Sequence, residues 1–273
     1  MWIRELGHLD QPVMLFGGPY SNVQATQALM SQAERHAIPG THRICTGDVV
    51  AYCGKPNETV DLICASGCAV VAGNCEKQLA SNAADCGCGF DEGSACDMLS
   101  VGWYRFANTH LSRSARDWMQ QLPDVAVFWH HGKRFAVIHG GHTDIARFIW
   151  PTSTDEVFEQ EWAALEASVG ALDGVISGHC GLAFTKRTKH GVWINAGVIG
   201  MPPNDGDINT CFAILDNGNI THHSLVYDAQ SAQQDMVKAG LSQGYDTSLI
   251  SGYWPSEDVL PPALRRSLAL ASG

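Results

Sequence analysis

Four polar side chains stand directly after apolar runs of the chain, where they could together bind a metal ion. Asp48, Asn74, His139 and His179 each follow a short hydrophobic segment, and each has a glycine beside it. In open parallel sheets, ligand-binding groups collect in the loops at the carboxyl ends of the strands. One Asp, one Asn and two His residues form a mixed nitrogen and oxygen ligand set. Taken singly, an Asp there is a helix cap and an Asn a turn residue, so the prediction rests on all four together.

The elements that must position these residues are short apolar runs that alternate with helical patterns. Residues 12–16, 42–46 and 67–72 are predicted to be buried strands, with helices over 22–35 and 58–64 between them. This β-α-β-α-β order predicts a mostly parallel sheet with right-handed crossovers.

The rest of the chain shows no linker or break in composition, so we predict one domain spanning residues 1–273. Residues 76–121 are mainly helical, interrupted by a Gly- and Cys-rich insert at 85–97, and a hairpin turns around His131-Gly132-Lys133. The core is expected over 12–242, with a C-terminal tail at 243–273. We predict an α/β domain with strands in two sheets and helices outside. The remaining predicted elements are an amphipathic helix at 156–168, strands at 175–176, 182–185, 192–196, 211–215 and 220–227, and a helix at 229–239.

The composition excludes some classes of function. Apolar residues make up 45% of the chain and charged residues 16%, which is enough apolar material for a buried core. Lys and Arg total 17 against 28 for Asp and Glu, a net charge of -11, so bulk nucleic-acid binding is not expected. No apolar run approaches the ~18 residues that cross a bilayer. With no signal-like N-terminus either, we expect a cytoplasmic protein that does not bind membranes.

The order Gly47-Asp48, Gly73-Asn74, His139-Gly140 and Gly178-His179 resembles the calcineurin-like metallophosphoesterase superfamily. The similarity is greatest to its compact bacterial and archaeal phosphoesterase branch, and it covers residues 12–242. It includes two further segments, Asn195–Pro202 and Val226–Ala229. The resemblance implies a two-sheet β-sandwich flanked by helices on both sides, in four αββα layers. It also implies a phosphoric ester hydrolase in which two metals hold a phosphoryl group.

By this resemblance, Asp48, Asn74, His139 and His179 hold one metal, and that ligand set is complete. The ligands of the second metal do not carry over: an Asp-x-His motif falls on Gly18-Pro19-Tyr20, and the last His of a Gly-His-x-His turn falls on Gly181. Tyr20 and Cys180 are the possible substitutes. We therefore expect one divalent metal ion (Mn, Fe, Zn or Mg) rather than two.

The catalytic His of the family's Asn-His-Asp motif is also absent, because the sequence here is Asn74-Cys75-Glu76. Cys75 or Glu76 would then assist hydrolysis of a phosphomonoester or phosphodiester by metal-activated water, on a small phosphorylated substrate. The alternative is a catalytically weak or inactive phosphoesterase-fold protein with a binding or regulatory role and a structural or redox cysteine cluster.

Ten cysteines are present, and eight of them lie between residues 45 and 96. Their spacing matches neither a zinc ribbon nor a ferredoxin, so a packed loop with free thiols is the favoured interpretation over a metal or redox site. Five thiols are expected near the site: Cys75, Cys86, Cys88, Cys96 and Cys180. The other five are expected to be core residues: Cys45, Cys53, Cys64, Cys68 and Cys211.

Two further residues have alternative interpretations. His142, three residues past His139, could approach the site, although a position outside it is the simpler expectation. Arg147 could contact a substrate phosphate, because a guanidinium group matches phosphate oxygens, but a surface ion pair is the simpler interpretation.

Overall fold

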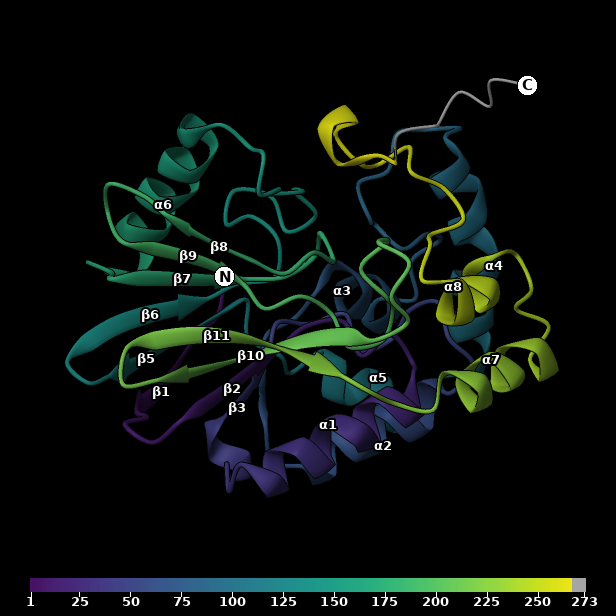
Figure 1. Cartoon of the computed structure of the whole chain (residues 1–273), viewed down its shortest axis with the longest axis horizontal. Helices are drawn as coiled ribbons and strands as arrows, with labels where there is room; N and C mark the ends of the chain where they lie inside the picture. Colours follow the sequence, from purple (N-terminus) through teal and green to yellow (C-terminus); the bar gives the residue numbers. More distant parts are fainter. Residues whose placement is uncertain (267–273) are drawn as a thin grey trace.

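The computed structural model describes residues 1–266, and its strands form two packed sheets (Figure 1). The six-stranded sheet has the order β1 (Ile3–His8), β5 (Val125–His130), β6 (Lys133–Val137), β7 (Gly174–Ser177), β9 (Val192–Asn195) and β8 (Phe184–Arg187). The five-stranded sheet has the order β11 (Asn219–Leu225), β10 (Thr210–Asp216), β2 (Val13–Phe16), β3 (Arg43–Cys45) and β4 (Ala69–Val70).

The helices cover the outer faces of both sheets, α6 on one side and α1 and α2 on the other (Figure 1). Phe158 and Trp162 of α6 pack on Trp193 of the six-stranded sheet. No helix within residues 1–266 is long and apolar enough to span a membrane. The α-helices are α1 (Val23–Arg35), α2 (Pro56–Ala65), α3 (Asn74–Ala80), α4 (Ala95–His110), α5 (Arg113–Met119), α6 (Asp155–Val169), α7 (Ala229–Lys238) and α8 (Tyr245–Ser251), with 3-10 turns at Gly40–His42 and Pro262–Leu264.

The core between the sheets is built from the inward faces of both. Leu15 and Ile44 of the five-stranded sheet pack with Phe128, Val137 and Ile176 of the six-stranded sheet, and all five side chains are buried. Burial of such side chains stabilises each by about 1.5–3 kcal/mol. The predicted four-layer αββα architecture is confirmed.

The mostly parallel sheet predicted for the N-terminal half is present as β2, β3 and β4, which pair in parallel and are joined through α1 and α2. The sheets as a whole are mixed, because hairpins such as β5–β6 and β10–β11 are antiparallel. The parallel pair β6–β7 lies in the other sheet. Each sheet therefore contains parallel neighbours whose carboxyl ends are adjacent, β3 and β4 in one and β6 and β7 in the other.

Two elements were not predicted from the sequence. Strand β1 pairs in parallel with β5 at the sheet edge, and its residues are only partly buried or exposed, so it carries no apolar alternation. Helix α8 lies in the segment predicted to be a tail, where it packs against α7 and buries Tyr245 and Leu249. In addition, the strand expected over 67–72 is reduced to β4, since Gly67 lies in a turn and residues 68, 71 and 72 have no regular secondary structure.

Candidate metal site

The four predicted ligands come in pairs from the two sheets. Asp48 follows β3 and Asn74 opens α3 directly after β4, and these two strands are parallel neighbours. His139 follows β6 and His179 follows β7, which are parallel neighbours in the other sheet. Because the carboxyl ends of both pairs meet where the sheets are packed together, all four side chains converge at the seam.

The geometry of the site is centred on Nε2 of His139. This atom lies 3.0 Å from Oδ1 of Asn74, 3.0 Å from Nδ1 of His179 and 3.2 Å from Oδ2 of Asp48. The other ring nitrogen, Nδ1 of His139, donates to the carbonyl oxygen of Thr46 at 2.6 Å. Nδ1 therefore carries the ring hydrogen, and the Nε2 lone pair of the neutral imidazole faces the other ligands.

The amide of Asn74 has a fixed orientation. Its Nδ2 donates to the carbonyl oxygen of Cys86 at 3.0 Å and to Sγ of Cys88 at 3.4 Å, which leaves Oδ1 facing His139. The ligand atoms of Asp48, His139 and His179 all lie within 4.8 Å of one another, and all three residues are buried. Buried lone pairs that converge in this way need a positive charge between them, either a proton on Nε2 of His139 or a metal ion. Two imidazoles, a carboxylate and an amide oxygen fit a divalent transition metal.

The ionisation of these groups depends on their burial and on one another. Burial would lower the pKa of His139, but the Asp48 carboxylate outweighs it and raises that pKa above its ordinary value. The pKa of Asp48 is lowered by His139, although burial acts in the opposite direction. Burial and the neighbouring His139 lower the pKa of His179 to about 3, so its imidazole is neutral and available as a ligand at pH 7.

Comparison with known proteins identifies the family to which this chain belongs. The family profile of the calcineurin-like phosphoesterase superfamily domain matches residues 19–219. The chain belongs to this superfamily. An uncharacterized protein of Methanocaldococcus jannaschii is 24% identical over 244 residues, covering 85% of this chain and 95% of that protein.

Two solved structures show the same fold. A metallophosphoesterase from Sphaerobacter thermophilus has a TM-score of 0.69 at 20% identity, covering 89% of this chain and all (100%) of that one. A hypothetical protein from Pyrococcus horikoshii has a TM-score of 0.71 at 17% identity, covering 88% and 98%. The match of the family profile to residues 19–219 confirms the predicted membership of the calcineurin-like phosphoesterase superfamily.

Two of the candidate ligands have a strained backbone. Asp48 has φ +54° and His179 has φ +63°, in the left-handed region that side chains other than glycine seldom adopt. Such a conformation costs about 1–3 kcal/mol and persists only where surrounding contacts hold it. The loop of His179 is held by Asn195, whose Nδ2 donates to the carbonyl oxygen of Gly178 at 2.7 Å.

The loop of Asp48 is held by Glu76. The Glu76 carboxylate accepts backbone N–H groups from Asp48 at 2.7 Å, Val49 at 2.8 Å and Gly73 at 2.9 Å. A Cβ atom at Gly73 would overlap the Asp48 carboxylate, so only glycine fits there. Burial, followed by the nearby Asp48, raises the pKa of Glu76 to about 7. Because both Glu76 oxygens accept backbone N–H groups, Glu76 stabilises the loop that carries Asp48.

Cys75, the second candidate for a catalytic role, is buried beside Asn74. Its backbone N–H donates to Oδ1 of Asp48 at 3.3 Å, and its Sγ accepts from Nδ2 of Asn74 at 3.5 Å. Burial, together with the Asp48 charge, raises the pKa of the Cys75 thiol well above its ordinary value, so the thiol is protonated at neutral pH. A protonated thiol is a weak nucleophile.

The cysteines expected near the site are buried around it, but they do not join the ligand cluster. Cys86 and Cys88 form a disulfide, so the expected loop of free thiols is wrong for this pair. Sγ of Cys180 accepts from Nδ2 of Asn195 at 3.2 Å, and burial raises the pKa of the Cys180 thiol to about 12. Within residues 1–266, the only cluster of three or more potential His, Cys, Asp or Glu ligands is that of Asp48, His139 and His179. Among the expected core thiols, Cys64 is exposed.

Two positions of the second metal's missing ligands disfavour a larger side chain. A Cβ atom at Gly18 would lie 2.5 Å from the ring of Tyr20 and 2.7 Å from Cγ1 of Val198, so this position is crowded. A Cβ atom at Gly181 would make only an ordinary contact of 3.4 Å with the indole of Trp254, but Gly181 has φ +78°, which disfavours any side chain there. Burial raises the pKa of the Tyr20 phenol well above its ordinary value. Crowding at Gly18 and the left-handed backbone at Gly181 thus disfavour the metal ligands that the superfamily resemblance implies there.

His142 and Arg147 both lie outside the ligand cluster. Nε2 of His142 hydrogen bonds to Oγ of Ser168 at 2.9 Å. Nη1 of Arg147 donates to Oε1 of the buried Glu161 at 2.6 Å. Glu161 also accepts the backbone N–H groups of His142 at 2.6 Å and Thr143 at 2.9 Å. Arg147 and Glu161 therefore fasten the loop after His139 to α6.

Sequence reasoning missed several residues that shape the site. The Thr46 carbonyl that orients His139 carries no side-chain signal, and Phe148, whose ring centroid lies 4.3 Å from that of His179, is far from it in sequence. Trp254 lies in the segment predicted as a tail. Asn195 begins the segment Asn195–Pro202, which is part of the family resemblance, so its role near the site could have been predicted from the sequence.

Proposed function

We propose that the protein hydrolyses a phosphomonoester or phosphodiester with one divalent metal ion held by Asp48, Asn74, His139 and His179. The observation that carries the proposal is the convergence of three polar atoms within 3.2 Å of Nε2 of His139. Crowding of Gly18 by Tyr20 and Val198, together with the left-handed backbone of Gly181, favours one metal over two. Membership of the calcineurin-like phosphoesterase superfamily supports the reaction class.

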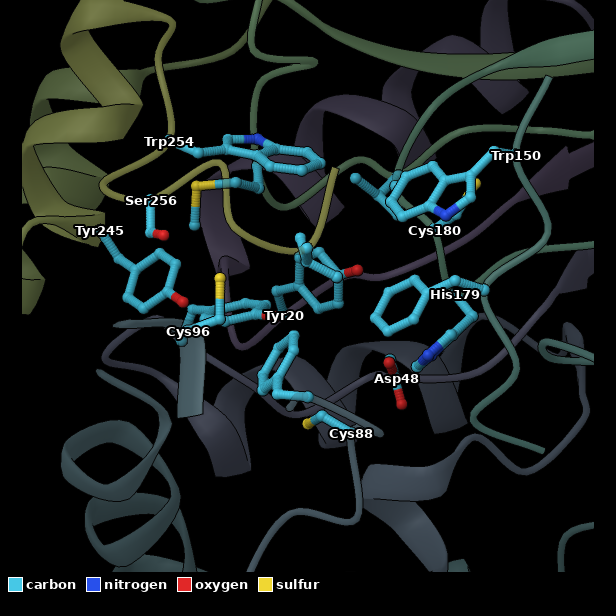
Figure 2. A pocket seen from close by; sticks show the side chains of 17 residues that line it. Tyr20, Asp48, Cys88, Cys96, Trp150, His179, Cys180, Tyr245, Trp254 and Ser256 are labelled. Carbon is cyan, nitrogen blue, oxygen red and sulfur yellow. The ribbon is translucent and has the colours of Figure 1, made fainter. Parts of the chain in front are cut away.

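A divalent cation at this site would polarise a phosphoryl oxygen and lower the pKa of a water molecule. The ligand set of two imidazoles and two oxygen donors suits Mn, Fe or Zn better than Mg, which prefers oxygen ligands. Asp48 and His179 line the cavity in front of the site (Figure 2) and are the ligands nearest to a bound substrate. Cys75 and Glu76 do not line it, so we assign them to the support of Asp48 and Asn74.

The test combines metal analysis with turnover. The purified protein, loaded with Mn, Fe, Zn or Mg in turn, should contain about one metal ion per chain. It should hydrolyse p-nitrophenyl phosphate or bis-p-nitrophenyl phosphate. Asp48→Asn and His139→Ala should each lower kcat/KM at least about a hundredfold, since loss of metal ligation removes the main electrostatic contribution. His142→Ala is the matched control, because His142 lies in the same loop but outside the cluster.

Absence of turnover with all four metals would contradict the hydrolase. If metal binding then also had no effect on thermal stability, the alternative of a phosphoesterase-fold binding or regulatory protein would be favoured. Two metal ions per chain would contradict the single-metal assignment while leaving hydrolysis intact.

A further inference from the structure

The cavity in front of Asp48 and His179 is walled by aromatic side chains. The empty space between these side chains, including solvent at the open mouth, is about 610 Å³. The metal ligands form one side of it, and Trp150, Trp254 and Tyr245 stand around the rest (Figure 2). Its walls match a flat apolar group, which can lie against aromatic faces.

The cavity lacks the groups that recognise additional phosphates. None of its lining residues within the described chain is a lysine or arginine. Arg147, in the loop between His139 and Trp150, has its guanidinium engaged by Glu161 and Gln160. Basic side chains are the usual partners of phosphate oxygens, and the chain as a whole has a net charge of -11. A polyphosphate would therefore place uncompensated negative charges in an apolar cavity.

The aromatic walls are fixed in place before any ligand binds. Nε1 of Trp254 donates to the carbonyl oxygen of Pro202 at 2.7 Å, and its backbone N–H donates to Oδ1 of Asn204 at 2.7 Å. Phe148 and Trp150 stack with their ring centroids 5.2 Å apart and an interplanar angle of 2°. Rigid aromatic faces bind a planar ring at little cost in conformational entropy.

We infer that the substrate carries a single phosphoryl group esterified to a planar aromatic moiety, which binds between Trp254 and the Phe148–Trp150 pair. This inference rests on the proposed function and adds the substrate class. A simple aryl or arylmethyl phosphate and a nucleoside monophosphate share the required chemistry. Both place one phosphoryl group near Asp48 and His179 and one flat ring against the indole faces.

The binding experiment uses non-hydrolysable ligands, so that it does not depend on turnover. Benzylphosphonate and n-butylphosphonate are titrated into the metal-loaded protein, with calorimetry as the readout. Stacking on an aromatic side chain is worth about 1–3 kcal/mol, so benzylphosphonate should bind about five- to 150-fold more tightly. Trp254→Leu should remove most of that ratio, whereas Trp254→Phe should retain it. Trp129→Leu, on β5 and outside the cavity, is the control.

The kinetic experiment compares benzyl phosphate, n-butyl phosphate, adenosine monophosphate and adenosine triphosphate. The leaving groups of the first two are both primary alkoxides, so a higher kcat/KM for benzyl phosphate reports binding of the ring. A further gain with adenosine monophosphate over benzyl phosphate would identify a nucleoside ester, and the reverse order a simple aryl ester. Adenosine triphosphate should be the poorer nucleotide by at least about tenfold, because the cavity offers its extra phosphates no cation.

The outcomes separate this inference from the proposed function. Equal turnover and equal binding of the benzyl and butyl compounds would overturn the aromatic pocket and leave the hydrolase standing. A preference for adenosine triphosphate over adenosine monophosphate would overturn the single-phosphoryl assignment. Tight benzylphosphonate binding without turnover of any ester would overturn the hydrolase while supporting the aromatic pocket. If Trp254→Leu fails to fold, Trp150→Leu provides the same comparison from the opposite wall.

Discussion

Asp48 illustrates how one residue can be both strained and well supported. Its left-handed backbone directs the carboxylate at His139, and its own N–H donates to Glu76. Glu76, which the sequence offers as a candidate catalytic residue, therefore binds the backbone of Asp48 instead. Glu76 lies 28 positions after Asp48 in the chain, so this contact could not be deduced from local sequence.

Removal of the Glu76 carboxylate should destabilise the metal-free protein strongly. Buried N–H groups of Asp48, Val49 and Gly73 would lose their acceptor, and each orphaned group costs about 1–3 kcal/mol. Glu76→Ala should lower the free energy of unfolding by about 3 kcal/mol or more in urea denaturation, and Glu76→Gln by less, because one acceptor oxygen remains. Exposed Glu58→Ala serves as the control and should change it by less than about 0.5 kcal/mol. A change of that small size for Glu76→Ala would refute the supporting role.

Metal binding should compete with a proton on His139. Because the pKa of His139 is raised by Asp48, the metal-free imidazole keeps its proton to higher pH than an ordinary histidine and must lose that proton to become a ligand. The apparent metal affinity should therefore weaken as pH falls from 8 to 6, approaching about tenfold per pH unit below the folded pKa. Calorimetric titration in buffers of different ionisation enthalpy measures the proton released. An affinity independent of pH over this range would be inconsistent with the assigned ligand.

His139 should also make the folding stability of the metal-free protein depend on pH. A raised His pKa contributes stability that is fully present below the unfolded pKa of about 6.5 and is lost as pH rises through the folded pKa. The His139–Asp48 pair should therefore stabilise the metal-free protein more at pH 6 than at pH 8. Metal-loaded protein should show the opposite trend.

At the scale of elements, the loop between β6 and α6 carries one ligand and much of the cavity wall. His139, Phe148 and Trp150 all lie on it, and Glu161 of α6 holds it through Arg147 and two backbone N–H groups. This loop has no regular secondary structure over most of its length. Its shape therefore depends on side-chain contacts to α6.

Glu161→Gln should loosen this loop. Burial would raise the pKa of Glu161, but hydrogen bonds from Thr143 and Arg147 lower it overall, so its stabilising contribution is present above about pH 4.5 and is lost as pH falls through the folded pKa. The substitution should cost about 2 kcal/mol in urea unfolding at pH 7 and should reduce metal affinity. Glu159→Gln, on the same helix with an exposed Lys189 partner, is the control and should have little effect. Equal unfolding free energies for the two variants would rule out the clamp.

The elements that the sequence predicted well are those with apolar strands followed by a polar turn. Strands β3, β4, β6 and β7 were found in this way, and with them the four candidate ligands. Strand β1 was missed because an edge strand of mixed exposure lacks an apolar pattern. Helix α8 and Trp254 were missed because their packing on the site depends on residues far away in the chain, such as Pro202 and Asn204.

For the whole molecule, metal binding should be measurable as global stabilisation. A ligand that binds only the folded state at a hundred times its Kd adds about 2.7 kcal/mol, which corresponds to a rise in Tm of about 5–10 °C for a chain of this length. Mn or Zn should produce this shift in wild type and in His142→Ala, and a chelator should reverse it. Asp48→Asn should abolish most of the shift. A full shift in that variant would place the bound metal elsewhere.

The four candidate ligands follow strands of two different sheets, so a bound metal ion should resist separation of the sheets. Two candidate ligands follow strands of one sheet and two follow strands of the other, and the layer between the sheets is mainly apolar. A bound cation would act as a cross-link between the layers, and sliding of one sheet along the other would break it. Amide protons in β3 and β7 should then become slower to exchange with solvent deuterium together, although no hydrogen bond joins these two strands.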